Sequence, residues 1–285
     1  MFSSRQLVIA CLASFAATVA FSAPIPAPDL HAKVLELYSF QPHTLNDAQL
    51  TAKSAQLDTF WKLVKEDPAS TLPLLRAELA NPSNPSFFYY DGAKLLLSLS
   101  SDAEDQRLVL RSIVKADLQD IQPTDYLLTV HRLVAQGFDT RDAALHVLDD
   151  PDFIATIPQH ALRLGQNYSL IYMLFPMDED SFVPALVDRL SGQQSATSVK
   201  SVLLALWCAA TPESLAALRK FADARQGPPE AVSYAQKLQG AKGFVPSLSS
   251  LSSLREERRR LMRRAISDEA LIEFESLTRK IQAKQ

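Results

Sequence analysis

The stretch Ser201–Arg219, SVLLALWCAATPESLAALR, decides the fold class that the sequence predicts. Its segment Leu203–Ala210 is apolar on every side of a helix, which is typical of a helix buried all round. The tripeptide Thr211-Pro212-Glu213 then marks a helix start, with a capping hydroxyl, a proline where no N–H is needed, and an acid near the positive helix end. The stretch therefore predicts two helices joined by a short loop.

The same helical spacing continues through most of the chain. From Asp29 onward the apolar residues recur at helical intervals, and no window shows sustained strand-like alternation between glycine-containing turns. Only 7 of the 285 residues are Gly and 17 are Pro, and this scarcity of glycine argues against all-β folds with many tight turns. We therefore predict an all-α protein.

Helix–loop–helix units follow one another along the chain. The last large apolar residue of one helix is followed eleven positions later by an apolar residue of the next, across an acidic or proline-bearing loop. Successive units are 36, 35, 41 and 32 residues apart, and two helices in a period near this length are typical of α-solenoids. The five pairs are Leu63 and Leu74, Leu99 and Leu110, Val134 and Leu145, Phe175 and Leu186, and Trp207 and Leu218.

Over about residues 46–240 the chain resembles HEAT-like repeat proteins. The resemblance rests on the helix–short acidic loop–helix unit and on a Leu/Ala-rich second helix, as in Thr211–Arg219. It implies a right-handed α-solenoid of about five helical hairpins, followed by a C-terminal charged helical pair. The tetratricopeptide and ankyrin signatures are missing. An irregular helical bundle, whose helices merely have similar lengths, is the alternative.

The N-terminus has the features of a secretory signal peptide. Arg5 is followed by the apolar run Leu7–Phe21 and then by the small residues Ser22 and Ala23. Because a membrane span needs about 20 apolar residues, we interpret residues 1–22 as a signal peptide. We therefore predict an exported protein, periplasmic or secreted. Its one remaining cysteine, Cys208, cannot close an intramolecular disulfide.

The rest of the chain divides into four predicted segments. Residues 23–45 are a proline-rich lead-in with a first helix, and residues 46–239 are the helical-repeat domain. Residues 240–253 contain two Gly, one Pro and five Ser, a composition that predicts a flexible linker. Residues 254–285 then form a C-terminal helical arm.

One segment of this arm carries a marked local charge. Residues 255–264, REERRRLMRR, contain six Arg and two Glu, whereas the whole chain has a net charge of −3. A basic helix of this kind fits an acidic partner protein. Packing back onto the repeats as a cap is the alternative. The predicted partner-binding residues of the arm are Arg258, Arg259, Arg260, Arg263 and Arg264.

The charge pattern also bears on a membrane and on a nucleic acid as partners. The helix has too few apolar residues for insertion into a bilayer, so we expect at most a weak contact with an anionic membrane. The near-neutral chain gives no reason to expect a nucleic acid.

The aromatic run Phe87-Phe88-Tyr89-Tyr90 is the second candidate surface. Four consecutive rings cover nearly all faces of a helix, so at least one points away from the main core. We predict Tyr89 as a partner-binding residue. The alternatives are that Tyr89 covers a seam between hairpins, or that an aromatic and acidic groove belongs to a cell-envelope hydrolase.

The residues that catalysis or metal binding would need form no recognisable motif. Cys208 lies in an apolar run, which predicts a buried and unreactive thiol. His131, His146 and His160 are 15 and 14 residues apart, outside the spacings of known zinc motifs. The acidic clusters 149–152 and 178–180 are interpreted as helix starts.

We predict no cofactor and no metal. The sequence therefore favours an exported, non-enzymatic protein-binding or scaffold module. The envelope hydrolase and an envelope tether through the Arg-rich helix are the alternatives.

Overall fold

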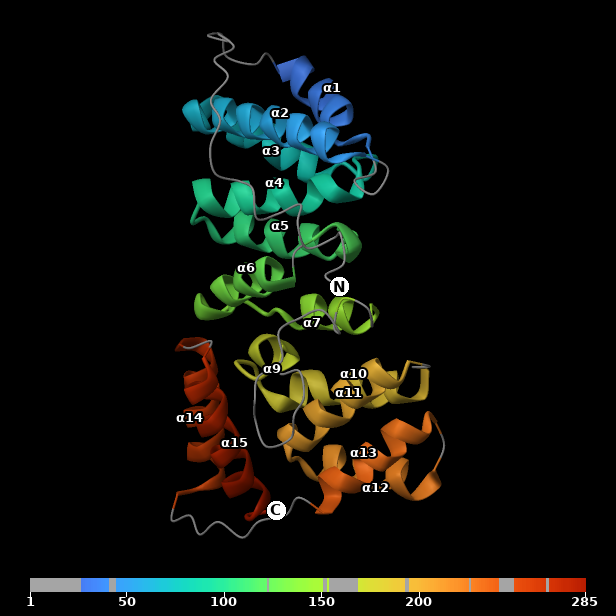
Figure 1. The fold of residues 1–285 in the computed structure, drawn as a ribbon. Helices are drawn as coiled ribbons and strands as arrows, with labels where there is room; N and C mark the ends of the chain where they lie inside the picture. Colours follow the sequence, from blue (N-terminus) through green and yellow to red (C-terminus); the bar gives the residue numbers. More distant parts are fainter. Residues whose placement is uncertain are drawn as a thin grey trace. The chain divides into compact units, whose positions relative to one another are not determined.

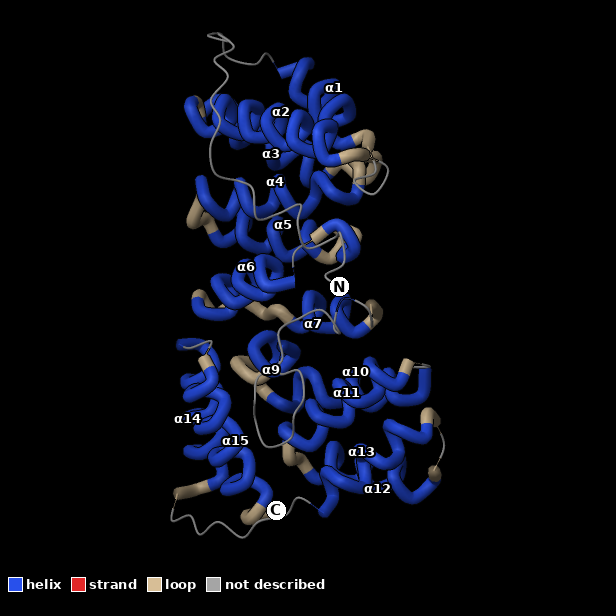
Figure 2. Tube along the Cα trace, in the orientation of Figure 1, coloured by secondary structure: helices blue, strands red, loops and turns tan. Residues whose placement is uncertain are grey.

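A computed structural model describes residues 27–40, 45–121, 123–150, 153, 169–192, 195–225, 227–240, 249–264 and 267–285. Within these ranges the chain forms fourteen α-helices, one short 3-10 helix and no strand (Figure 2). The prediction of an all-α protein is confirmed. The predicted signal peptide, His160 and most of the predicted linker lie outside the described residues. No helix in the described ranges is both long and apolar enough to cross a bilayer.

Two compact units make up the chain, Met1–Gln122 and Pro123–Gln285 (Figure 1). Their boundary falls inside the stretch 46–239 that we expected to be one domain. The first unit contains α1 (Ala27–Tyr38), α2 (Asp47–Glu66), α3 (Pro68–Ala80), α4 (Ser86–Leu99), α5 (Ala103–Ile113) and the 3-10 helix (Leu118–Asp120). The second unit contains α6 (Pro123–Ala135), α7 (Arg141–Leu148), α9 (Ser169–Leu174), α10 (Glu179–Gly192), α11 (Ala196–Ala209), α12 (Pro212–Ala224), α13 (Pro229–Gly240), α14 (Leu251–Arg264) and α15 (Asp268–Gln282).

The loops between paired helices lie where the sequence pattern placed them. Asp67 separates α2 from α3, and its side chain accepts a hydrogen bond from the backbone N–H of Ser70. Asp102 caps α5 in the same way, through the N–H groups of its first turn. Thr211 starts α12 with a capping box, in which its hydroxyl and that of Ser214 each accept from the other's backbone N–H. Polar caps of this kind satisfy N–H groups that a helix start leaves without partners.

In the first unit the core positions differ from the predicted pairs, by one residue in the first pair. Leu63 and Leu74 are half-buried, whereas the next residues, Val64 and Leu75, are 0% and 1% exposed. The predicted pairs of the second unit fit better, since Trp207 and Leu218 are each 2% exposed. A pattern of consecutive apolar residues therefore located the helices but not always the side that faces the core.

Helix α11 is at the centre of the second unit. Eleven of its residues are buried, and it packs against α7, α9, α10, α12, α13 and α15. This burial explains why the run Leu203–Ala210 has no polar face. The HEAT-like resemblance and the regular stacking of a solenoid stay predictions, because the described contacts do not test them.

The C-terminal arm packs back onto the second unit. Helices α14 and α15 lie side by side, α14 packs on α6 and α9, and α15 packs on α11 (Figure 1). Leu254 on α14 joins Ala210, Leu277 and Ile281 in one buried apolar cluster. The alternative in which the arm covers the preceding helices is therefore the arrangement that the structure shows.

Candidate functional site

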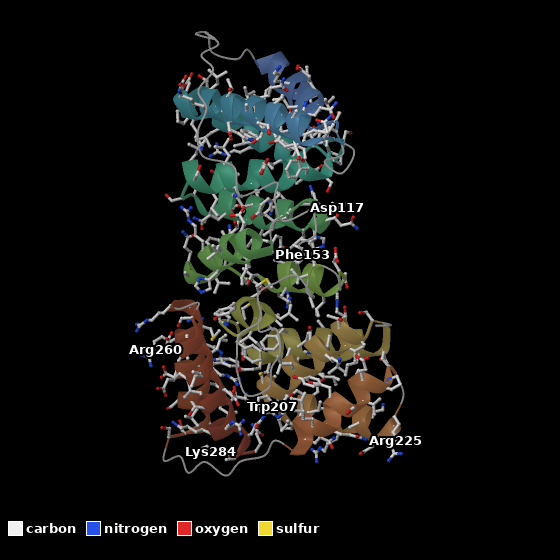
Figure 3. The ribbon with its side chains drawn as sticks, viewed as in Figure 1. Asp117, Phe153, Trp207, Arg225, Arg260 and Lys284 are labelled. Carbon is white, nitrogen blue, oxygen red and sulfur yellow. The ribbon has the colours of Figure 1, made fainter. Side chains whose placement is uncertain are left out.

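The arginine run of α14 divides into buried and exposed members. A helix turns by about 100° per residue, so the consecutive Arg258, Arg259 and Arg260 face three directions. The Arg258 side chain is 0% exposed, that of Arg259 is 18% exposed, and Arg260 is exposed. Figure 3 shows Arg260 pointing away from the ribbon. One charged sequence motif thus supplies both an interior contact and a surface.

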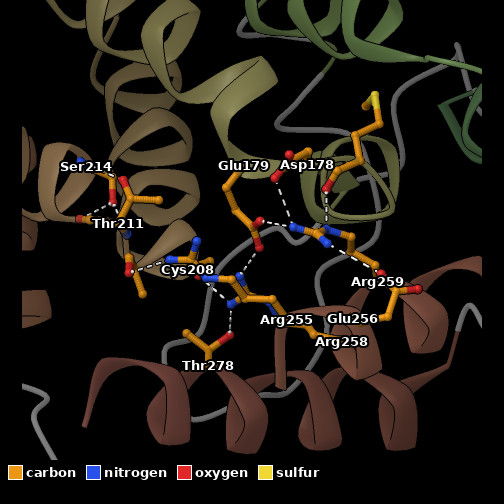
Figure 4. Close-up of polar contacts among 12 residues, drawn as sticks. Asp178, Glu179, Cys208, Thr211, Ser214, Arg255, Glu256, Arg258, Arg259 and Thr278 are labelled. Carbon is orange, nitrogen blue, oxygen red and sulfur yellow. Dashed lines mark hydrogen bonds and ion pairs between the residues drawn. The ribbon is translucent and has the colours of Figure 1, made fainter. Parts of the chain in front are cut away.

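Arg258 makes the interior contact. Its Nη2 donates to Glu179 Oε1 at 2.8 Å, and its Nη1 donates to the Cys208 carbonyl at 2.5 Å and to Thr278 Oγ1 at 2.8 Å (Figure 4). The guanidinium carbon lies 4.8 Å and 5.2 Å from the ring centres of Phe175 and Phe274. Arg258 therefore joins α9, α10, α11 and α15. The prediction that it binds a partner does not fit this position, because no partner can reach a fully buried side chain.

Glu179 is the carboxylate on which this arrangement depends. It is itself fully buried, and it pairs with Arg259 at 2.6 Å as well as with Arg258. Burial alone would raise the pKa of Glu179, but the charge and hydrogen bond of Arg258 hold this pKa below its ordinary value. The sequence analysis interpreted Glu179 as part of a helix-start cluster. The structure adds that its side chain binds two arginines on a helix about eighty positions later.

The other half-buried arginines donate to carbonyl groups at the ends of helices. Arg259 Nε donates to Met177 O at 3.1 Å, and Arg263 Nη2 donates to Pro176 O at 2.8 Å, both just beyond the end of α9. Arg255 Nη2 donates to Ala210 O at 3.2 Å, just beyond the end of α11. These three carbonyls lie one to three residues past the last helical residue. Helix α14 supplies them with side-chain donors.

Two exposed arginines remain at the C-terminal end of α14. Arg260 and Arg264 are exposed, and no ion pair joins either of them to another residue of the described chain. Arg263 is 40% exposed and lies beside them, 3.8 Å from Glu256. We call Arg260, Arg263 and Arg264 the arginine end. Its guanidinium groups match the paired oxygens of carboxylates, which they bind with two parallel hydrogen bonds.

Tyr89 lies in the first unit, whereas the arginines of α14 lie in the second. It is 4% exposed, its hydroxyl donates to Asn81 O at 2.6 Å, and Lys115 Nζ lies 5.0 Å from its ring centre. Burial raises the pKa of its phenol. The partner-binding prediction for Tyr89 does not fit this burial. The alternative in which it covers a seam does, because Tyr89 joins the start of α4 to the end of α3.

The cysteine and two of the histidines considered for catalysis or metal binding are buried or half-buried in the fold. Cys208 is fully buried, and this burial raises the pKa of its thiol well above the ordinary range. His131 Nε2 lies 3.0 Å from Met262 O at the end of α14, and His146 is half-buried on α7. No group of three or more His, Cys, Asp or Glu side chains gathers as a metal site anywhere in the described ranges.

Each carboxylate with a shifted pKa has a basic partner of its own. The pKa is lowered at Glu36 by Lys33, at Asp105 by Arg76, at Glu230 by Lys200 and at Glu179 as described above. Each of the four belongs to a different helix and has its own basic partner. A hydrolase would need its acid and base together in one site. These shifts are therefore explained by ion pairs, and they give the hydrolase alternative no support.

Comparison with protein-family models, with curated proteins and with solved structures found no significant match to this chain.

Proposed function

We propose that this protein is an exported, non-enzymatic binding protein that holds an acidic segment of another protein at the arginine end of α14. The observation that carries the proposal is the placement of Arg260 and Arg264. Both are exposed and without an ion-pair partner in the described chain, on a helix whose opposite side is fixed in the interior by Arg258. Exposed, unpaired charges on a rigid support are what an acidic partner requires.

The rigid support matters for affinity. Ordering a long side chain on binding costs about 0.5–1.5 kcal/mol, and ordering a whole segment costs more. Helix α14 is already held by Arg255, Arg258 and Arg259, so a partner orders only the outer side chains. Arginine is also among the residues that contribute most at protein interfaces.

An acidic protein fits this surface better than a membrane does. The large apolar residues of α14 face inward, since Leu254 and Met262 are 1% and 0% exposed. The outer face instead carries Ser252, Ser253 and Glu257 together with the arginines. A helix that enters the headgroup region presents an apolar face to the lipid. The outer face of this helix is polar and charged.

The test is site-specific photo-crosslinking in the native source. A photoreactive amino acid at position 260 should crosslink to one protein through an acidic segment, which is then purified and titrated with the intact chain. The double variant Arg260→Glu and Arg264→Glu should weaken this binding at least tenfold, because it replaces attraction by repulsion. The matched control is Arg219→Glu with Lys220→Glu on the exposed side of α12, which should bind as the unchanged chain does.

Two results would refute the proposal. One is a partner whose affinity is the same for the charge-reversed and the unchanged chain. The other is salt-sensitive binding to vesicles of anionic phospholipid, lost in the same variant, without any protein crosslinked at position 260. That second result would identify the chain as an envelope tether.

A further inference from the structure

The surface beneath α14 is built to accept guanidinium groups. It consists of the backbone carbonyls of Pro176 and Met177 after α9, those of Cys208 and Ala210 at the end of α11, and the carboxylates of Asp178 and Glu179 at the start of α10. We call it the acceptor surface. The groups named here are all oxygen acceptors, and two helix C-termini add the negative ends of their dipoles. Such a surface requires a cationic donor with several N–H groups.

The occupant of the acceptor surface shows which ligand fits. Helix α14 places Arg255, Arg258, Arg259 and Arg263 on it, a spacing of i, i+3, i+4 and i+8. Leu254 and Met262 flank Arg258 on the same face and are buried with it. A complementary ligand is thus an amphipathic helix with arginines at this spacing between apolar residues. Helix α14, which occupies the acceptor surface, thus defines the class of ligand.

The contact combines charge with apolar packing, since Leu254 and Met262 are buried on the same face as Arg258. A buried ion pair must offset the cost of removing both ions from water, and it is often no more stabilising than apolar residues of the same volume. Arg258 Nε also has no hydrogen-bond partner among the described residues. The ion pair therefore gives the acceptor surface selectivity for arginine more than it gives net strength. A contact selected in this way can be exchanged between helices that carry the same arginines.

We propose that the acceptor surface is a binding site for an arginine-bearing amphipathic helix, and that α14 is its tethered occupant, which a helix of the same arginine spacing displaces. In this arrangement α14 acts as an internal competitor. A tether of a few residues gives a competitor an effective concentration near the millimolar range, so an external helix binds only weakly while α14 is in place. A substitution that weakens the contact of α14 with the acceptor surface, and leaves that surface unaltered, should then raise the affinity of the chain for the external helix.

The test uses the full chain and a fluorescent synthetic peptide of residues 249–264, with binding followed by fluorescence anisotropy. Arg258→Ala in the chain removes a donor of the tethered helix and leaves every acceptor in place, so the peptide should bind at least tenfold more tightly than to the unchanged chain. Glu179→Gln loosens the same helix but damages the acceptor surface, so the gain should be absent. A peptide that itself carries Arg258→Ala is the matched control and should not bind.

Hydrogen exchange of α14 and α15 gives the independent measure of opening. Arg258→Ala and Glu179→Gln should both increase exchange in these two helices, while only Arg258→Ala gains peptide affinity. If Arg258→Ala does not fold, the half-exposed Arg263→Ala replaces it, with the same direction and a smaller change. Helices that open without peptide binding, helices that stay protected in every variant, or equal peptide binding by Glu179→Gln would each overturn the proposal.

The two proposals are tested separately. This one concerns the inner face of α14, to which Arg263 also contributes, whereas the crosslink at position 260 concerns the outer face that α14 presents while it is in place. Charge reversal of Arg260 and Arg264 in the chain should leave peptide binding within twofold of the unchanged chain, so the failure of one proposal is distinguishable from the failure of the other.

Discussion

The two partners of the buried ion pair should differ in what their loss costs. Glu179→Gln leaves Arg258 charged, fully buried and without a carboxylate. Removing one partner of a buried pair costs about 3–5 kcal/mol of unfolding free energy. Arg258→Met leaves Glu179 still paired with Arg259 at 2.6 Å. The methionine also keeps an apolar side chain between Phe175 and Phe274, where sulfur contacts aromatic rings favourably.

The cost of Arg258→Met is then limited to the acceptors that lose their donor. These are the Cys208 carbonyl and the Thr278 hydroxyl, and unsatisfied buried groups cost about 1–3 kcal/mol. We expect Glu179→Gln to be the more destabilising variant by about 2 kcal/mol. The double variant should be less destabilised than the sum of the two, because it no longer buries an unpaired charge.

Urea unfolding followed by tryptophan fluorescence measures these values. The chain has two tryptophans, one in each unit, so Trp61→Phe as the common background makes Trp207 report on the second unit alone. Arg260→Met is the control and should change the unfolding free energy by less than about 0.5 kcal/mol, as an exposed substitution does. Equal costs for the two single variants, or a strictly additive double variant, would refute the reasoning.

Three further predictions follow from single side chains. Burial lowers the pKa of His131 in the folded chain. The stability that depends on the neutral imidazole is therefore fully present above the ordinary pKa near 6.5, and it is lost as the pH falls toward the lowered pKa. Between about pH 7.5 and 5.5 the unfolding free energy should drop less in His131→Gln than in the unchanged chain. Arg225 ends α12 with a φ of 50°, so Arg225→Gly should raise the melting temperature by removing about 1 kcal/mol of backbone strain, whereas Ala216→Gly inside the same helix should lower it. The buried Cys208 should react with a thiol reagent only at the rate of opening, so labelling faster than hydrogen exchange of α11 would contradict its placement.

The helices and their loops followed from local chemistry, and this is why the sequence predicted them. The capping groups Asp67, Asp102 and Thr211 act within three residues of themselves. The burial of Cys208 also followed, because a helix without a polar face has nowhere to lie except the interior. Neither conclusion required knowledge of which segments meet in space.

The division of the arginine run was harder to predict. Leu254, Arg258 and Met262 recur at a spacing of four, and this stripe was the signal for a buried face that the charge of the run concealed. The stripe alone does not predict whether the buried Arg258 forms an ion pair with a carboxylate. Glu179 supplies it from α10, and no feature near residue 179 marks it as different from the acids beside it.

The sequence by itself determined that this chain is helical, where several of its helices begin, and that one short segment holds most of its unbalanced positive charge. The tertiary structure alone decided which of those charges are available to a partner. The reason is that helical geometry fixes the angles between neighbouring side chains, while the direction of the whole set depends on the carbonyl groups at and just beyond the ends of α9 and α11, which accept hydrogen bonds from α14.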